Sequence, residues 1–179
     1  MNYMKSFPSP IGELVAVCSE HHLLGLWMDG QKYFLNTMHG NYEKVTSHPV
    51  LDQVQDWLER YFGNEKPLPG ELPLAPQGSA FRQCIWKHLC EIPYGELTTY
   101  GSLARQAAAE LGKERMSAQA VGGAVGHNPI SIIIPCHRVV GTNGSLTGYA
   151  GGLDKKIFLL EQEGVDMTKL FVPKKGMVR

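Results

Sequence analysis

Apolar residues in the first part of the chain follow two periods, one typical of strands and one typical of a helix. Residues 14–17 and 23–27 are apolar segments on either side of the polar residues 19–22, a pattern that predicts a β-hairpin. Further on, a helix is predicted to begin at Pro49, which is favourable in a first turn, and to end at Gly63. Its apolar stripe consists of Val50, Val54, Leu58 and Phe62. The first part is therefore expected to be a small α+β unit that serves as a scaffold.

A stretch rich in proline and glycine, residues 66–78, separates this part from the rest. Four prolines and two glycines in thirteen residues cannot continue a helix or a central strand, so an extended linker is expected. We therefore predict two domains, residues 1–76 with this linker and residues 77–179. The second domain begins with a helix that Ser79 can cap and that Pro93 ends. The apolar stripe of this helix consists of Phe81, Ile85, Leu89 and Ile92.

Two short helices follow and are joined by a polar turn. The first can begin at Thr98 or Thr99 and ends near Gly112, and the second can be capped by Ser117 and ends near Gly126. Such a pair is typical of a helix-turn-helix that binds DNA, but it also occurs as a plain packing unit. The pattern alone leaves both explanations open.

Two adjacent glycines, Gly122 and Gly123, lie inside the last of these helices, where each costs about 1 kcal/mol relative to alanine. They let either another helix or a ligand such as a nucleic-acid backbone approach the main chain closely. Residues 1–79 contain five Lys and Arg against nine Asp and Glu, whereas residues 80–179 contain twelve against eight. The C-terminal part is therefore suited to a polyanion, although the whole chain has no net charge.

Composition argues against several other classes of protein. With 43% hydrophobic and 19% charged residues the chain can fold around a core, and its apolar runs are far shorter than the roughly 20 residues that cross a bilayer. The N-terminus has no apolar signal-peptide core. The four cysteines show no CxxC spacing, which fits free thiols in a reducing compartment and argues against a four-thiolate zinc site. We expect a cytoplasmic protein without membrane contact, cofactor or bound metal.

One cysteine stands beside residues that are expensive to bury. Residues 130–134 (Ile-Ser-Ile-Ile-Ile) predict a buried β-strand that Pro135 ends, and Cys136 follows at once. A cysteine next to apolar sequence is usually an inert core residue. His137 and Arg138 weaken that interpretation, because a basic or cationic neighbour favours the reactive thiolate. Cys136 is therefore a candidate nucleophile, with His137 as its base.

A histidine that acts as a base needs a third group to orient it. The acidic candidates are Asp154, Glu161, Glu163 and Asp166. Adjacent side chains of a strand point to opposite faces, so the proton reaches His137 either after the proline bends the chain or through a water molecule. A tight turn is predicted at residues 143–144. The glycine-rich residues 148–152 can then fold over a flat ligand, with Tyr149 as a wall.

The sequence Pro-Cys-His-Arg-Val-Val at residues 135–140 resembles the signature of the O6-alkylguanine-DNA alkyltransferases, or methylated-DNA–protein-cysteine methyltransferases. The resemblance covers most of residues 79–165 in the family's order. Its other parts are residues 120–124, 128–129, 148–152 and 163–164, with weaker matches at 9–14 and in the linker. It implies an α+β fold with a small ribonuclease-H-like N-terminal domain and a C-terminal, winged helix-turn-helix-like domain that carries the active-site cysteine.

The resemblance also implies stoichiometric DNA repair. The expected partner is double-stranded DNA that contains O6-alkylguanine, bound in the minor groove by a monomer that uses no cofactor. The damaged base is rotated out of the stack, and its alkyl group moves to Cys136; O4-alkylthymine is expected to be a second substrate. The thioether product has no good leaving group, so each protein molecule is expected to react once.

By the same resemblance, each catalytic residue has an expected role. Cys136 is the nucleophile, His137 takes its proton through a water molecule, and Glu163 orients the histidine. Asn128 braces the turn around the thiol. Tyr100 donates a hydrogen bond toward the guanine ring as negative charge develops there.

The resemblance assigns further residues to the base and to the duplex. Main-chain groups at Cys136, Val139 and Ala150 read the edges of the flipped base, and Tyr149 packs on its face. The expected DNA contacts are Gln119, Ala120, Gly122 and Arg138. Many members have an arginine where this chain has Gln119, which loses a charge and a planar stacking surface. Some members have a serine where this chain has Ala150, which leaves the main-chain N–H as the donor.

Two alternatives come from other functional classes. A thiol hydrolase would use Cys136 and His137 on an acyl substrate with turnover, and it would leave the helix-turn-helix pattern without a use. A DNA-binding regulator without chemistry would keep Cys136 only as a structural residue. Of the other cysteines, Cys18 and Cys84 are expected to lie in the core. The histidines at residues 21–22 have no matching set of zinc ligands in the first domain.

Overall fold

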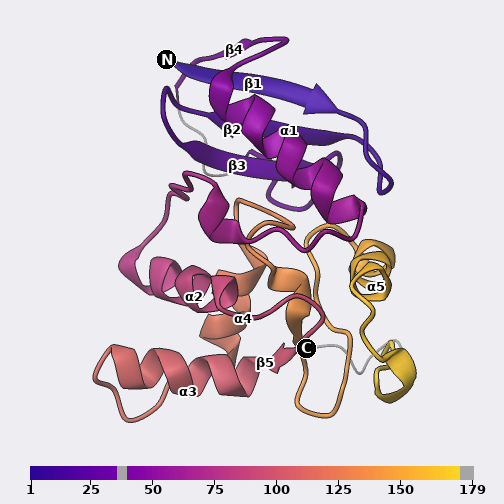
Figure 1. Cartoon of the computed structure of the whole chain (residues 1–179). Helices are drawn as coiled ribbons and strands as arrows, with labels where there is room; N and C mark the ends of the chain where they lie inside the picture. Colours follow the sequence, from indigo (N-terminus) through magenta and orange to yellow (C-terminus); the bar gives the residue numbers. More distant parts are fainter. Residues whose placement is uncertain (36–39, 174–179) are drawn as a thin grey trace. The chain divides into compact units, whose positions relative to one another are not determined.

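The computed structural model describes residues 1–35 and 40–173, which fold into two compact units (Figure 1). The first unit comprises residues 1–78 and the short segment 129–134, and the second comprises residues 79–128 and the chain from residue 135 onward. The segment 129–134, which the sequence analysis includes in the second domain, thus belongs to the first unit. Within the described residues, no helix is long and apolar enough to cross a bilayer.

The first unit is built on a four-stranded sheet in the order β3–β2–β1–β4. Its strands are β1 (Asn2–Phe7), β2 (Leu14–Cys18), β3 (Leu23–Met28) and β4 (Tyr42–Lys44). β2 and β3 are antiparallel, with Leu14 opposite Met28 and Val17 opposite Gly25, which confirms the predicted hairpin. β1 pairs with β2 in the antiparallel sense and with β4 in the parallel sense. Neither β1 nor β4 is predicted from the pattern of apolar residues.

Helix α1 (Pro49–Phe62) lies across this sheet and buries most of the apolar stripe predicted for it (Figure 1). The ring of His48 accepts a hydrogen bond from the Val50 N–H, and the helix ends at Gly63, as predicted. The buried residues of α1 are Val50, Leu51, Val54, Trp57, Leu58 and Tyr61. The indole N–H of Trp57 donates to the carbonyl of Leu68 at 2.8 Å, which holds the start of the linker against the helix.

Residues 130–134 form a buried turn, and the strand predicted for them is wrong. The Ile134 N–H donates to the carbonyl of Ile130 at 3.1 Å, and Ile132 has a φ of +71°, in the left-handed region. The Ser131 N–H donates to the carbonyl of Leu26 in β3, which fastens the turn to the edge of the sheet. The isoleucines of the run are at most 1% exposed. A short apolar run therefore indicated burial here, but it did not distinguish a strand from a turn.

Three helices of the second unit begin at residues predicted to cap them. They are α2 (Ala80–Cys90) after Ser79, α3 (Tyr100–Glu110) after Thr99, and α4 (Ala118–Gly126) after Ser117. Each capping hydroxyl accepts a backbone N–H of the first turn, which satisfies a donor that the helix itself leaves unpaired. The indole N–H of Trp86 in α2 donates to the carbonyl of Ala124 in α4 at 2.8 Å, which ties these two helices together.

Short elements position the segment that contains Cys136. Strand β5 (Thr98–Thr99) pairs in parallel with β6 (Val139–Val140), and the 3-10 helix η2 (Cys136–Arg138) comes directly before β6. Helix α5 (Leu153–Gln162) ends one residue before Glu163, which therefore caps the helix. The other 3-10 helices are η1 (Pro69–Glu71) and η3 (Met167–Lys169).

Gly25→Ala is expected to destabilise the protein by about 2 kcal/mol, because the added methyl group would overlap the indole ring of Trp27 in a buried strand. Gly70→Ala is the matched control, since a Cβ at that position meets no described atom within 4 Å. Urea denaturation of both variants measures the difference. Equal free energies of unfolding would show that β3 accommodates the methyl group without cost.

Candidate active site

Cys136, His137 and Arg138 lie together in η2, directly after Pro135. The Arg138 N–H donates to the Pro135 carbonyl at 3.1 Å, so the chain turns here instead of continuing as an extended strand. All three residues are buried: Cys136 is 6% exposed, His137 0% and Arg138 5%. Because the chain turns, neighbouring side chains are not held on opposite faces as they would be in a strand.

The imidazole of His137 is oriented by Glu163. Its Nε2 lies 2.6 Å from Oε2 of Glu163, and both side chains are fully buried. An ionised carboxylate can only accept a hydrogen bond, so this contact assigns the proton to Nε2 and leaves the lone pair on Nδ1. Nδ1 is buried and has no hydrogen-bond partner among the described residues. The imidazole therefore presents an unused basic nitrogen inside the site.

Of the four acidic candidates, Glu163 is the one that contacts His137. Asp166 instead accepts the N–H of Thr168 at 3.0 Å and caps η3. Asp154 has a mostly exposed side chain next to Lys155, and Glu161 is exposed. Only contacts in the folded chain select among these residues, because all four follow His137 at sequence distances that a pattern cannot rank.

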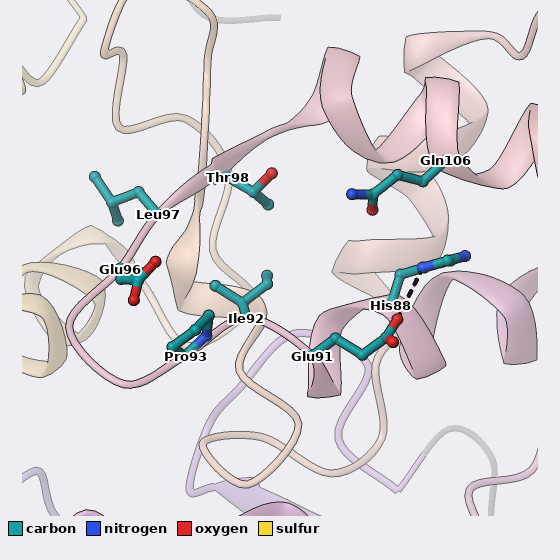
Figure 2. A pocket seen from close by; sticks show the side chains of 8 residues that line it. All are labelled: His88, Glu91, Ile92, Pro93, Glu96, Leu97, Thr98 and Gln106. Atoms are coloured by element: carbon teal, nitrogen blue, oxygen red, sulfur yellow. Dashed lines mark hydrogen bonds and ion pairs between the residues drawn. The ribbon is translucent and has the colours of Figure 1, made fainter.

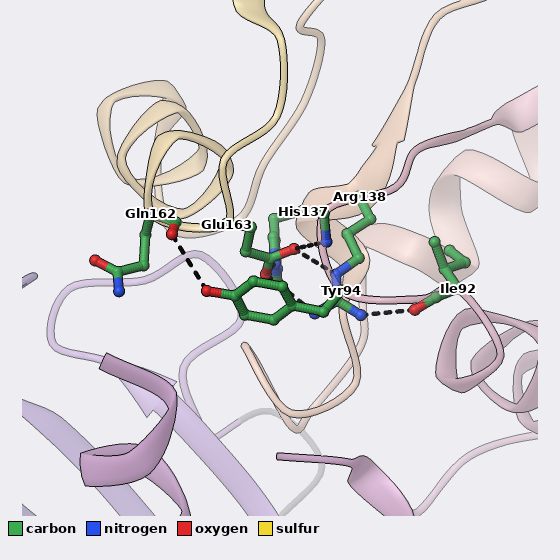
Figure 3. Close-up of polar contacts among 7 residues, drawn as sticks. Ile92, Tyr94, His137, Arg138, Gln162 and Glu163 are labelled. Carbon is green, nitrogen blue, oxygen red and sulfur yellow. Dashed lines mark hydrogen bonds and ion pairs between the residues drawn. The ribbon is translucent and has the colours of Figure 1, made fainter. Parts of the chain in front are cut away.

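Arg138 holds the other side of the Glu163 carboxylate. Its Nε donates to Oε1 at 2.7 Å and its Nη2 to Oε2 at 3.1 Å, while Nη1 donates to the carbonyl of Ile92 at 2.6 Å (Figure 3). The Gly95 N–H also donates to Oε1, at 3.0 Å. Arg138 is therefore part of a buried network, which corrects its expected role as a DNA contact: a guanidinium held in this way is not available to a phosphate group.

These contacts keep Glu163 ionised. Burial by itself raises the pKa of the Glu163 carboxyl, but the hydrogen bonds and charges of His137 and Arg138 outweigh it and hold that pKa well below its usual range. In contrast, burial lowers the pKa of His137, although Glu163 opposes the effect. We conclude that at neutral pH the pair consists of a charged carboxylate and a neutral imidazole, because Arg138 already balances the charge of Glu163.

The thiol of Cys136 has partners that favour its ionised form, but burial is the stronger effect. Burial raises the pKa of Cys136, whereas a hydrogen bond with the side chain of Asn128 and the positive charge of Lys156 lower it. The resting site thus contains a neutral thiol and, on the next residue of η2, a neutral imidazole. The arrangement can produce a thiolate when a reaction draws the proton away from sulfur, and it does not store one beforehand.

Lys156 is a residue of the site that the sequence analysis missed. Its Nζ donates to the carbonyls of Val139 at 2.6 Å and Thr147 at 3.1 Å, and the residue is 0% exposed. Burial lowers its pKa to about 8, and the negative charge that Cys136 carries when ionised opposes the shift. A signal was present in the sequence, because Lys156 stands at helical spacing from Leu153 and Leu160 on the apolar face of α5.

Two tyrosines complete the surroundings of the thiol. The hydroxyl of Tyr100, the first residue of α3, donates to the carbonyl of Thr147 at 3.3 Å. Burial, and then the negative charge that Cys136 carries when ionised, raise its pKa to about 12, so it remains a hydrogen-bond donor. Tyr149 lies edge-to-face against His137, with ring centroids 6.5 Å apart. Its side chain forms a hydrogen bond with Cys136, and burial raises its pKa well above the usual value.

The residues expected to touch DNA lie mainly on α4. Gln119, Ala120 and Gly123 are exposed, and Gly122 is half-buried. A Cβ added at Gly122 or Gly123 would meet no described atom within 4 Å. Close packing of another described part of the chain therefore does not explain the two glycines. The other explanation, that a ligand approaches the main chain closely at this point, remains. Val139 is fully buried and Ala150 is half-buried.

The geometry described above suits a protein whose chemistry is carried by a thiol nucleophile, and comparison with known proteins places the chain in a family. Residues 2–76 match the ribonuclease-like domain of 6-O-methylguanine DNA methyltransferase, and residues 80–165 match the DNA binding domain of the same protein. These matches confirm the predicted α+β fold class and its two parts.

Individual relatives agree with the family match. Proteins named methylated-DNA–protein-cysteine methyltransferase from Haemophilus influenzae and Methanosarcina acetivorans are 42% and 41% identical. The alignments cover 91% and 90% of this chain and 87% and 98% of the relatives. The crystal structure of Mycobacterium tuberculosis OGT in complex with DNA has a TM-score of 0.77 and 38% identity over 90% of this chain and 92% of that one. The chain belongs to the methylated-DNA–protein-cysteine methyltransferase family.

Glu163→Gln is expected to lower the free energy of unfolding at pH 7 by about 3 kcal/mol, because it leaves the buried guanidinium of Arg138 without a counter-charge. The folded-state pKa of Glu163 is depressed, so its stabilisation is present above the unfolded pKa of about 4.3 and is lost as the pH falls below that value. Urea denaturation at a series of pH values should therefore show the gap between wild type and variant closing in acid. A gap of constant size would contradict the assignment of an ionised Glu163.

Proposed function

We propose that this protein repairs DNA by transferring the alkyl group of O6-alkylguanine to its own Cys136, once per molecule. The observation that carries the proposal is the buried Nδ1 of His137, the residue next to Cys136 in η2, which keeps its lone pair while Nε2 is held by an ionised Glu163. Relatives that align over most of the chain are named for this activity, and a solved relative is described in complex with DNA.

The residues of the site support a transfer in which atoms and charges balance. Nδ1 of His137 takes the thiol proton, directly or through one water molecule, and Sγ of Cys136 attacks the alkyl carbon. The bond between that carbon and O6 breaks, and its electron pair remains on guanine. Tyr100 donates a hydrogen bond toward the ring as this charge develops. The whole reaction moves the alkyl group from oxygen to sulfur and one proton from the thiol to guanine.

The burial of Cys136 requires the substrate base to leave the helix. A side chain that is 6% exposed cannot reach an alkyl carbon stacked inside a duplex, so the damaged nucleotide is extruded before it reacts. An alkylated base pair costs less to open, which favours damaged sites. O4-alkylthymine presents the same alkoxy group beside a ring nitrogen and is a second substrate. In the pocket, main-chain groups of Val139 and Ala150 bind the edges of the base, and the ring of Tyr149 lies against it.

Helices α3 and α4 supply the proposed contact with the duplex. Gln119 and Ala120 on the exposed part of α4 face the minor groove, and the missing side chains at Gly122 and Gly123 let the main chain approach the phosphates. In this proposal residues 77–179 form the domain that binds DNA and accepts the alkyl group, residues 1–76 support it, and one cytoplasmic monomer acts on each lesion.

The site argues against both alternatives considered from the sequence. A DNA-binding regulator without chemistry would leave the buried base nitrogen of His137 and the ionised Glu163 without a use. A hydrolase acting on an acyl substrate would form a thioester on Cys136 that water can cleave, but it would leave the helix pair α3–α4 and the open space around Gly122 and Gly123 without a use. The two alternatives and the proposal therefore differ in stoichiometry.

Incubation of the protein with a duplex that contains one O6-methylguanine should add one methyl group per protein molecule, and peptide mapping should find it on Cys136. Cys136→Ala should gain no mass. Cys90→Ala, the matched control, should still gain one methyl group, because Cys90 has no part in the site. Product formed beyond one equivalent would indicate a hydrolase, and binding of the duplex without a mass change would indicate the regulator.

Gly122→Ala should separate stability from DNA binding. Alanine replaces a helical glycine that has free space around it, so the free energy of unfolding should rise by about 1 kcal/mol. The same methyl group should hinder approach of the phosphate backbone and weaken binding of a methylated duplex, as measured by fluorescence anisotropy at fixed salt. Unchanged affinity together with higher stability would remove the proposed role of the glycines.

A further inference from the structure

A second cluster of reactive side chains lies in the second unit and has no part in the proposed repair reaction. Cys84 and His88 are four residues apart on α2, so they project from the same face of the helix, and Glu110 is the last residue of α3. One ligand atom of each lies within 4.8 Å of the other two. We propose that Cys84, His88 and Glu110 bind one divalent transition-metal ion of the zinc type, which links α2 to the end of α3.

The orientation of His88 supports this proposal. Its Nδ1 lies 3.1 Å from Oε1 of Glu91, and a carboxylate only accepts, so Nδ1 carries a proton and, in the neutral ring, the lone pair is on Nε2. Nε2 is buried and has no hydrogen-bond partner among the described residues. Its distance to Oε1 of Glu110 is 3.8 Å, which is too long for a hydrogen bond. A buried acceptor without a donor is costly, and a metal ion would satisfy it.

Glu91 takes the position that a supporting carboxylate has in many zinc sites. There, the imidazole that binds the ion with one nitrogen donates its other N–H to a carboxylate, which fixes the tautomer and the direction of the ring. Figure 2 shows this contact between His88 and Glu91, at the edge of a cavity of about 310 Å³. The histidine is thus already arranged as a ligand before any ion binds.

Cys84 and Glu110 share a proton that a metal ion would replace. The thiol of Cys84 donates to Oε2 of Glu110 at 2.8 Å, and burial together with this carboxylate raises its pKa to about 11. When a divalent cation binds, the sulfur–hydrogen bond breaks, the proton leaves to solvent, and a sulfur–metal bond forms. The thiolate and the carboxylate then balance the two positive charges of the ion.

The set of ligands indicates which ions fit. One sulfur, one imidazole nitrogen and one carboxylate oxygen suit zinc, cobalt or nickel, whereas magnesium and calcium prefer oxygen alone. The side chain of Glu110 is 37% exposed, which gives an ion a way in. Nζ of Lys87 lies 3.3 Å from Oε1 of Glu110 and would compete with the ion for this oxygen. The Lys87 side chain is 68% exposed, however, and can move away. A water molecule would complete a tetrahedron.

A bound ion is expected to affect the stability of the helices. An ion at this point would join the middle of α2 to the last residue of α3, which is the helix that leads into α4. Any ligand that binds only the folded state stabilises it in proportion to the logarithm of its concentration. Binding should therefore raise the thermal stability of the chain without any change in the chemistry of Cys136, and the site is a structural addition to the proposed function.

Titration of the reduced full-length chain with cobalt(II) tests the proposal. The Cys136→Ser variant is used as the parent, so that the thiol beside His137 cannot bind the probe. We expect a thiolate-to-cobalt charge-transfer band that saturates at one equivalent, release of one proton for each ion bound, and loss of the band when zinc is added. Zinc should also raise the melting temperature of the parent protein.

The variants replace either a proposed ligand, the carboxylate that orients His88, or a control residue outside the site. Cys84→Ser should abolish the band, while His88→Gln and Glu110→Gln should each weaken binding by at least about tenfold, and Glu91→Gln should weaken it by about tenfold. Cys90→Ala, on the same helix but outside the cluster, should bind like the parent. Glu110 and Glu91 lie at the surface, so their variants remain informative if Cys84→Ser does not fold. Absence of the band in the parent, or equal binding by parent, Glu110→Gln and His88→Gln, would overturn the proposal.

Discussion

The site depends on a buried carboxylate that stays ionised. The side chain of Glu163 is completely removed from solvent, which would ordinarily favour its protonated form. However, Arg138 donates to both carboxylate oxygens and the Gly95 N–H adds a third hydrogen bond. Because Arg138 already balances the charge, His137 can remain neutral and still be held through its Nε2. The orientation of the imidazole, its free Nδ1 and its capacity to accept a proton all follow from this one arrangement.

Burial has a similar effect on every thiol of the chain, so the pKa alone does not identify the reactive one. It raises the pKa of Cys18, Cys84 and Cys90 to about 11 and also raises that of Cys136. What distinguishes Cys136 is the set of groups around it: the Asn128 side chain, the buried charge of Lys156 and a neutral imidazole with an unused lone pair. In the proposed reaction the thiol stays protonated, and protected, until an extruded base supplies an electrophilic carbon.

Elements that are defined by local signals, such as capping residues and apolar periods, could be predicted from the sequence. Caps and apolar periods located α1, α2, α3 and α4 within a few residues, and two apolar segments around a polar turn located the hairpin. Strands β1 and β4 were not predicted, because β1 buries only Met4 and Phe7 and β4 is exposed throughout, which leaves little apolar pattern in either. The run 130–134 became a turn because hydrophobicity alone does not fix backbone direction. The prediction that Arg138 contacts DNA was wrong for a related reason. The motif shows that a positive charge is present, but only the fold shows that Glu163 neutralises this charge.

The central claim is that His137 is neutral in the resting protein, with its proton on Nε2 and its lone pair on Nδ1. Nitrogen-15 NMR of the imidazole measures this directly, since protonated and unprotonated ring nitrogens have well-separated chemical shifts. The account predicts an unprotonated Nδ1 and a protonated Nε2 at pH 7, with the ring still neutral below the ordinary histidine pKa of about 6.5, because burial lowers its pKa. A doubly protonated ring at pH 7, or a proton on Nδ1 in the neutral ring, would contradict it.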